Sequence, residues 1–288
     1  MFQIIGIVVL FGCVFGSYLL SGGSMAPILH SLAFELMGIG GAAVASVLIS
    51  NDMHTIKGMG GGMGKVFGGA KWKPADYRDL LSLLFQLTKT MKAKGVIALE
   101  SHIEKPHDSS IFSRYPKIMK DHFAIDFICD TLRMMTMNLE DPHQVEDAME
   151  KQLEKHHHEA MHPAHAMQSV ADALPALGIV IAVLGVIKTM GAITEPPEVL
   201  GGMIGGALVG TFLGVMLAYG LVGPFATRMN GVVEEEGAFY KIIQAVLVAH
   251  LHGNAAQISV EIGRGNIPSG AQPSFAEMEE ALNNIPNE

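Results

Sequence analysis

Glycine recurs at every fourth position of one long uncharged stretch, and this pattern limits the possible folds more than any other feature. The row consists of Gly202, Gly206, Gly210 and Gly214. No charged residue and no histidine occurs from Leu200 to Val222, a stretch long enough to cross a bilayer as a helix. In water each glycine would weaken a helix by roughly 0.5–1 kcal/mol relative to alanine, whereas in lipid small residues let a second backbone approach closely. The sequence therefore predicts a membrane helix that packs tightly against other helices.

Three further apolar segments are candidate membrane spans. In chain order the four segments are Phe2 to about Leu20, Leu36–Ser50, Ala173–Ile187 with an extension to about Ile193, and the glycine-rich stretch. Short polar connections join the first to the second and the third to the fourth, so we expect two helical hairpins. The first segment lacks a basic start and a small-residue cleavage motif, so we interpret it as a retained span rather than a signal peptide.

Charge indicates how the spans are oriented. The net charge of −9 argues against binding to nucleic acid. Neither short connection contains Lys or Arg, whereas the stretch between the second and third spans and the C-terminal tail contain many. By the positive-inside rule both of these hydrophilic parts are predicted to be cytoplasmic.

The expected fold is therefore all-α, with four transmembrane helices, a large helical cytoplasmic segment between spans two and three, and a cytoplasmic tail that extends span four. We divide the chain into a first transmembrane hairpin (residues 1–50), a cytoplasmic helical domain (51–170), a second hairpin (171–224) and a cytoplasmic helical tail (225–288). In the cytoplasmic domain, helices are predicted from Pro74 with Leu80, Leu81, Leu84, Leu87 and Met91 on one face, from about Pro116 to Leu139, and from about Gln144 to Glu159. The tail is expected to stay helical to about Leu251 and then to become looser.

The glycine-dense stretch that begins at Gly58 resembles a phosphate-binding loop only superficially. The required spacing places Met59 at the first glycine position and Val66 where Ser or Thr should bind magnesium. No predicted strand precedes it. We interpret it as a flexible turn beside the membrane.

One motif supports an alternative enzymatic function. His158, Glu159 and His162 match H-E-x-x-H, in which two histidines on one helix face bind zinc and the glutamate acts as general base. However, Pro163 is expected to remove His162 from helical geometry, the surrounding tract is rich in histidine, and no third ligand is obvious. We expect no metal and no cofactor, and interpret the tract as a solvated, pH-sensitive segment, with a membrane zinc protease as the alternative.

Charged side chains are absent from the centres of the predicted spans. Glu35 lies just before the second segment, where it could attract cations at an outer entrance or could simply lie at headgroup level. Because a proton pathway needs a titratable group, any ion conduction by this chain would require a carboxylate from another polypeptide. The small-residue row could then contact that partner or sister copies, or it could serve packing within one bundle.

Several motifs resemble the MotA family, the larger membrane subunit of the bacterial flagellar stator. They include Val14–Tyr18 with Gly22–Ser24, Leu174–Val180, and Gly210–Gly214 with Leu217–Gly220. The resemblance continues through Tyr115-Pro116 and Pro273–Phe275 and so covers nearly the whole chain. It implies a subunit of the inner membrane, of which several copies, thought to be five, surround a MotB-like single-span partner that carries the ion-binding Asp. Ion flow would drive torque on the rotor protein FliG.

The resemblance also implies roles for individual residues. Pro175 and Pro224 match prolines that couple ion flow to movement, and a proline permits a helix to kink. Thr211 matches a threonine that faces the ion path, Tyr219 lies in the same region, and Ala182 replaces a threonine of sodium-driven relatives and so favours protons.

Rotor contact is implied for two cytoplasmic residues. Glu100 matches a rotor-facing glutamate, and Lys92 stands where the family has arginine, which keeps the charge but loses the planar bidentate geometry. The related ExbB and TolQ proteins, which energise outer-membrane processes, have three spans and remain an alternative.

Overall fold

The regular elements of the computed structural model, which describes residues 2–137 and 141–285, are all helices. The α-helices are α1 (Phe2–Leu20), α2 (Ala26–Ser50), α3 (Met53–Gly68), α4 (Pro74–Lys94), α5 (Glu100–Glu104), α6 (Pro116–Met119), α7 (His122–Thr136), α8 (Pro142–Gly191), α9 (Pro197–Leu217), α10 (Gly223–Leu251), α11 (Ala256–Gly265) and α12 (Phe275–Asn283). Short 3-10 helices are η1 (Val96–Leu99), η2 (Pro106–Asp108) and η3 (Phe112–Arg114), and a π-helical segment η4 (Ala218–Val222) joins α9 to α10. The all-α prediction is confirmed.

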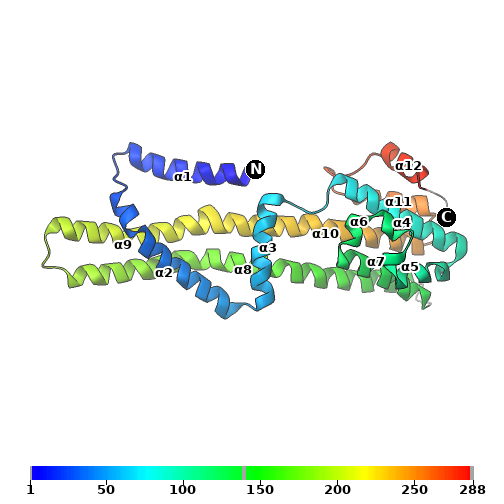
Figure 1. Ribbon diagram of the computed structural model, residues 1–288, viewed down its shortest axis with the longest axis horizontal. Helices are drawn as coiled ribbons and strands as arrows, with labels where there is room; N and C mark the ends of the chain where they lie inside the picture. The colour runs from blue at the N-terminus through cyan, green and yellow to red at the C-terminus, as the bar shows by residue number, and fades with distance from the viewer. Residues whose placement is uncertain (1, 138–140, 286–288) are drawn as a thin grey trace. The chain divides into compact units, whose positions relative to one another are not determined.

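Two compact units make up the structure (Figure 1). The span unit comprises Met1–Gly69 and Ala160–Val232, and the core unit comprises Ala70–Glu159 and Val233–Glu288. Four helical segments are long and apolar enough to cross a membrane, namely α1, α2, the apolar part of α8, and the continuous run from α9 into α10. The predicted division at residues 50, 170 and 224 concerns membrane topology and stays a prediction.

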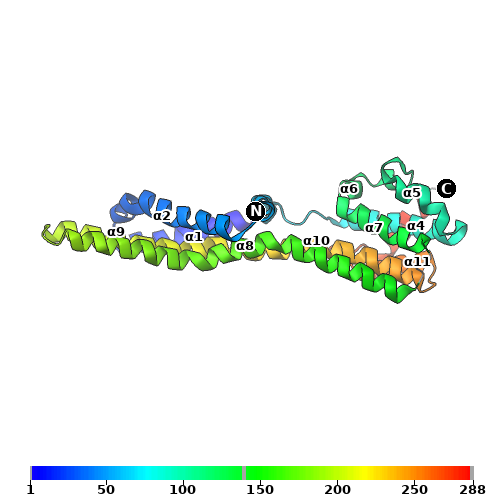
Figure 2. The same cartoon turned by 90° about the horizontal axis from the view of Figure 1, so that it is seen from below.

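Helix α2 crosses the long helices of the span unit obliquely in Figure 1 and lies on one side of them in Figure 2, where it packs on α9. It begins at Ala26, earlier than the predicted start at Leu36, because Ile28, Leu29 and Leu32 continue the apolar sequence before Glu35. Glu35 is therefore the tenth residue of a 25-residue helix and does not precede the helix. Its depth in the bilayer stays a prediction.

Helix α3 replaces the flexible turn predicted for the glycine-dense stretch. Asp52 caps its first turn by accepting a hydrogen bond from the Thr55 amide at 3.0 Å. A Cβ at Gly58 would lie 2.6 Å from Cγ of Pro163, so the glycine lets α3 lie directly on α8. The prediction of a turn was wrong: glycine has a low helix propensity, but close packing between helices determines the local structure here.

Helix α8 is a single helix of 50 residues, although the sequence predicted a charged helix to Glu159 and a separate span from Ala173. Pro163 and Pro175 both lie inside it. The expectation that Pro163 takes His162 out of helical geometry is therefore wrong, since the bias that proline places on the preceding residue is outweighed by packing of α8 against α3 and α10 around Ala164 and Met167.

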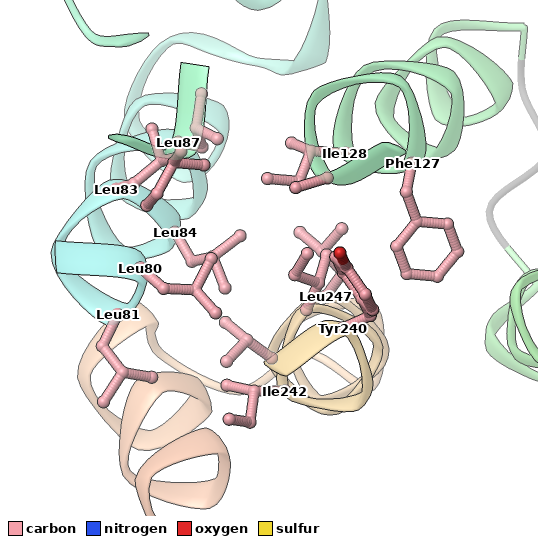
Figure 3. Close-up of a cluster of buried hydrophobic side chains, with 14 of the residues drawn as sticks. Leu80, Leu81, Leu83, Leu84, Leu87, Phe127, Ile128, Tyr240, Ile242 and Leu247 are labelled. Atoms are coloured by element: carbon pink, nitrogen blue, oxygen red, sulfur yellow. The ribbon is translucent and has the colours of Figure 1, made fainter. Parts of the chain in front are cut away.

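The core unit is built around α4, which is buried along most of its length (Figure 3). The leucines predicted to form one face are buried, and so are Leu83, Phe85 and Gln86 on the other sides. The helix predicted from Pro116 is broken into α6 and α7 where Asp121 caps α7, and its predicted end at Leu139 lies outside the described residues. The tail is more ordered than predicted, since α11 and α12 both pack on α4.

Candidate functional site: a glycine-lined helix contact in the span unit

Backbone contacts between α8 and α9 form the centre of the span unit. A Cβ on Gly178 would lie 2.6 Å from the carbonyl oxygen of Gly210, and a Cβ on Gly214 would lie 2.7 Å from that of Leu174. Cβ atoms do not tolerate such distances, so only glycine permits this approach. One turn or more further along α8, Gly185 is similarly close to Ala207. The predicted close packing of the glycine row therefore occurs within a single chain.

The four glycines of the row do not all serve this contact. Gly206 faces Ser31 of α2, since a Cβ there would lie 2.7 Å from the serine hydroxyl oxygen. Gly210 faces both α2 and α8, and Gly214 faces α8. Nothing in the span unit lies within 4 Å of a Cβ placed on Gly202. Gly202 thus has an open side, whereas the other three are occupied by the chain's own helices.

Three predicted residues of the ion path lie near this contact. Ala182 is buried on α8, and its amide nitrogen would be 3.4 Å from a Cβ on Gly210. Thr211 follows Gly210 on α9 and is half-buried, and Pro175 is half-buried within α8. Ala182 of α8 and Thr211 of α9 therefore lie in the same region of the span unit.

Tyr219 and Pro224 lie together in a separate cleft of about 720 Å³, which Gln168, Thr227 and Arg228 also line. Tyr219 is 70% exposed and belongs to the π-helical segment. At the end of that segment, the Gly223 amide donates to the carbonyl of Ala218, five residues earlier. Pro224 follows immediately, within a helical run that continues from Pro197 to Leu251. π-helical turns and prolines are both sites where helices bend.

Glu35 is the buried carboxylate of the span unit, with 8% of its surface exposed. Its Oε2 has no hydrogen-bond partner and would lie 2.5 Å from a Cβ on Gly210. The sequence did not reveal this contact, because hydropathy does not show which side of a helix faces a neighbour.

Lys92 and Glu100 lie on the surface of the core unit, near each other in sequence but on different helices. Lys92 is in the last turn of α4 and Glu100 begins α5, and both are exposed. Between them the chain turns at Gly95, whose φ of 82° is in the left-handed region that favours glycine. The structure thus presents both charges to solvent.

The zinc-site alternative lacks a complete set of ligands. His158 and His162 do lie four residues apart on one helix. Within residues 2–137 and 141–285, however, no group of three or more His, Cys, Asp or Glu side chains is placed to hold a metal ion. The motif therefore falls short of the three protein ligands that catalytic zinc sites use.

Comparison with known proteins gives a consistent result. Residues 4–95 match the family described as Motility protein A N-terminal, and residues 120–241 match the MotA/TolQ/ExbB proton channel family. "Motility protein A" of Escherichia coli is 38% identical over 287 residues, which cover 100% of this chain and 97% of the relative. "Chemotaxis protein LafT" of Vibrio parahaemolyticus is 34% identical, over 97% of this chain and 98% of the relative.

Two solved structures share the fold. The chain resembles a chain of the Campylobacter jejuni structure titled "Structure of C. jejuni MotAB" with a TM-score of 0.72 and 17% identity, over 95% of this chain and 98% of that one. A chain of the flagellar MotAB stator complex from Bacillus subtilis aligns with a TM-score of 0.67 and 21% identity, over 90% and 92%. These likenesses extend the sequence match to the arrangement of the helices.

Proposed function

Since the chain belongs to the Motility protein A family, we propose that it is a stator subunit of the bacterial flagellar motor, which conducts protons together with a MotB-like single-span membrane partner and converts their flow into torque. The observation that carries this proposal is the 38% identity to a Motility protein A over the whole chain, which includes the core unit as well as the spans. A proton-channel domain alone would not account for the match to the rest of the chain.

The partner supplies the ion-carrying carboxylate. From Leu200 to Val222, and in the apolar parts of α1 and α8, this chain has no acidic residue. The partner helix passes along the α8–α9 surface that bears Thr211, and further copies of this chain, five in all, complete the enclosure around it. Gly202, whose side is open within the chain, faces one of these neighbours.

Coupling of proton flow to movement depends on the two prolines. Pro175 interrupts the hydrogen-bond ladder of α8 next to the glycine contact, and Pro224 follows the π-helical segment beside Tyr219. Both helices therefore have a point at which they bend when the partner's carboxylate gains or loses its proton. Ala182, in place of a second threonine, sets the preference for protons over sodium.

The core unit transmits the movement to the rotor. Lys92 and Glu100 are exposed charges that contact the rotor protein FliG through electrostatic attraction, which acts over about one Debye length, roughly 8 Å at physiological salt. The chain lies in the inner membrane with both hydrophilic parts in the cytoplasm, as the distribution of Lys and Arg predicts. Glu35 lies on the extracytoplasmic half of its span, at the outer entrance.

Complementation tests the proposal directly. The chain is produced together with the neighbouring single-span gene in a strain that lacks its own stator, and swimming is measured at several sodium concentrations. Restored swimming that does not depend on sodium supports a proton-driven stator. Restoration of outer-membrane transport in a strain without ExbB, and no swimming, would instead identify an ExbB-like energiser.

A further inference from the structure

A cleft in the span unit leads from the ends of three helices to Glu35. It has a volume of about 800 Å³ and lies between α2, α8 and α9. Ala26 and Pro27 at the start of α2, Lys188 near the end of α8 and Val199 at the start of α9 all line it. The cleft therefore begins at the ends of the helices next to the two short connections.

Polar groups follow one side of this cleft down to the carboxylate. His30 is exposed, and Ser31 lies one helical turn before Glu35 on α2, so Ser31 and Glu35 share a face. Across from them, Thr189 of α8 is buried and donates its hydroxyl to the carbonyl of Gly185 at 2.9 Å. These groups provide hydrogen-bonding positions for water along the route.

Beyond Glu35 the route is closed. The contact between Gly210 and the backbone of Gly178 lies directly behind the carboxylate, and the side chain of Ile39, one turn further along α2, is fully buried. The two backbones are too close there to leave room for a side chain, and Glu35 is the last residue of α2 that lines the cleft. The cleft is a dead end within one subunit rather than a channel.

The unpartnered Oε2 requires neutralisation. An ionised carboxylate without a partner is strongly unfavourable away from water, so it must be paired, bind a cation or hold a proton. A metal cation needs several oxygen ligands, whereas Glu35 is the single carboxylate that lines the cleft and the nearby ionisable groups, His30 and Lys188, are basic. A proton is the species that this site fits.

We propose that Glu35 is a proton-holding site within the subunit itself, in exchange with water that enters the cleft past His30 and Ser31. In the neutral form the carboxyl packs against Gly210, which precedes Thr211. Ionisation would draw water to this contact and loosen α2 from α9. The site itself rests on the cleft and the buried carboxyl. A further step, in which each subunit couples its own proton uptake to the α8–α9 contact, rests on the proposed function.

Dicyclohexylcarbodiimide tests the site, because this apolar reagent reacts with protonated carboxyls and reaches groups inside membranes. Membranes from cells that produce the full chain and its partner are treated at pH 7, and the modified peptides of the chain are quantified by mass spectrometry. Modification of Glu35 is expected to exceed that of Glu195, an exposed loop carboxylate, by at least about tenfold, because exposed carboxylates are ionised at this pH.

Matched variants locate the modification and the route. Glu35→Gln should abolish it, and Glu195→Gln should leave it unchanged. In a Cys13→Ala, Cys129→Ala background, Ser31→Cys should react with a membrane-impermeant thiol reagent applied from outside, whereas Ala43→Cys, which is buried beyond Ile39, should not.

Two results would overturn the proposal, namely equal modification of Glu35 and Glu195, or an unreactive Ser31→Cys. These measurements do not require motility. If Glu35 is modified as expected but swimming is not restored in the complementation test, the site stands and the stator function fails. If swimming is restored but Glu35 is not modified, the function stands and this site fails.

Discussion

The span unit and the core unit are both made of packed helices, but their closest contacts differ in kind. In the span unit, the backbones of Gly178, Gly210 and Gly214 approach each other without intervening side chains. In the core unit, large side chains fill the space, as in the stack of Trp72 on Phe239 with ring centroids 3.7 Å apart. The glycine contact joins α8 to α9, whereas the aromatic stack joins α10 to the segment just before α4.

The difference follows from the solvent. In water, burial of apolar area drives association, at roughly 25 cal/mol per Å², so the core unit gains most from leucine, isoleucine and aromatic residues. In lipid that driving force is absent, and close van der Waals contact between small residues replaces it. The two units of the chain thus pack in different ways. Replacing a small residue by a large one should be most damaging in the span unit, and replacing a large residue by a small one should be most damaging in the core unit.

Gly210→Leu should have the largest effect. A side chain there would collide with Oε2 of Glu35 at 2.5 Å and with the carbonyl oxygen of Gly178 at 3.3 Å, so α2, α8 and α9 could not pack together. We expect loss of co-purification with the partner and loss of swimming. Gly202→Leu is the matched control, since it belongs to the same row but meets nothing within 4 Å in its own chain.

The pair of variants sharpens the comparison further. Gly202→Leu should preserve the folded chain, as judged by helicity and detergent stability. Its effects should be confined to assembly with other copies and to the cleft that Gly202 lines. A Gly210→Leu protein that still co-purifies and drives swimming would show that backbone contact is dispensable in the span unit.

Leu84→Ala should destabilise the core unit by about 3 kcal/mol, because the fully buried leucine leaves a cavity that its surroundings fill only partly. Thermal unfolding of the purified chain measures the effect. Ile97→Ala is the control, since 74% of Ile97 is exposed and the change should stay within about 0.5 kcal/mol. Equal effects of the two variants would refute the view that side-chain burial stabilises this unit.

Asp121→Asn should destabilise the core unit by about 2 kcal/mol at neutral pH, since hydrogen bonds to a charged group contribute about 1.5–3 kcal/mol. Asp121 accepts from the Lys71 ammonium at 2.7 Å, the Ala124 amide at 2.8 Å and the Tyr240 hydroxyl at 3.0 Å. Burial alone would raise the pKa of Asp121, but these donors outweigh it and hold the pKa below its ordinary value.

The depressed pKa sets the direction of the pH dependence. The carboxylate stabilises the folded state fully above its unfolded pKa of about 3.9, and this contribution is lost as the pH falls through the lower folded pKa. The gap in thermal stability between wild type and Asp121→Asn should therefore narrow at acid pH. A gap that stays constant from neutral to strongly acid pH would exclude charge as its cause.

Glu100→Lys should have the smallest effect on the fold, because the side chain is exposed. Reversal of its charge should reduce torque while leaving the free energy of unfolding within about 0.5 kcal/mol of the wild-type value. Rotation of tethered cells measures the torque. Normal torque in this variant would remove Glu100 from the rotor-facing surface.

Several features of the fold could be predicted from local sequence because their causes are local. The uncharged run from Leu200 to Val222 predicts a span, and the fourfold spacing of its glycines predicts close packing. The leucine pattern after Pro74 predicts α4. Each depends on composition and periodicity within one segment.

The features that the sequence did not reveal depend on contacts between distant segments. Glu35 is buried against Gly210, and the helix after Asp52 packs through Gly58 on Pro163. The cap at Asp121 is supported by Tyr240, which lies 119 residues away. Hydropathy and propensity describe a segment alone, so they do not show which neighbour a side chain will meet.

Proton flux into cells tests the central claim most directly, namely that the carboxylate carrying protons across the membrane belongs to a partner chain. Cytoplasmic pH is followed after an external acid pulse in cells that produce this chain alone, this chain with its single-span partner, or neither. The account predicts that the chain alone leaves the flux at the level of cells with neither, and that the partner raises it. Saturable flux in cells that produce this chain without the partner would contradict the account.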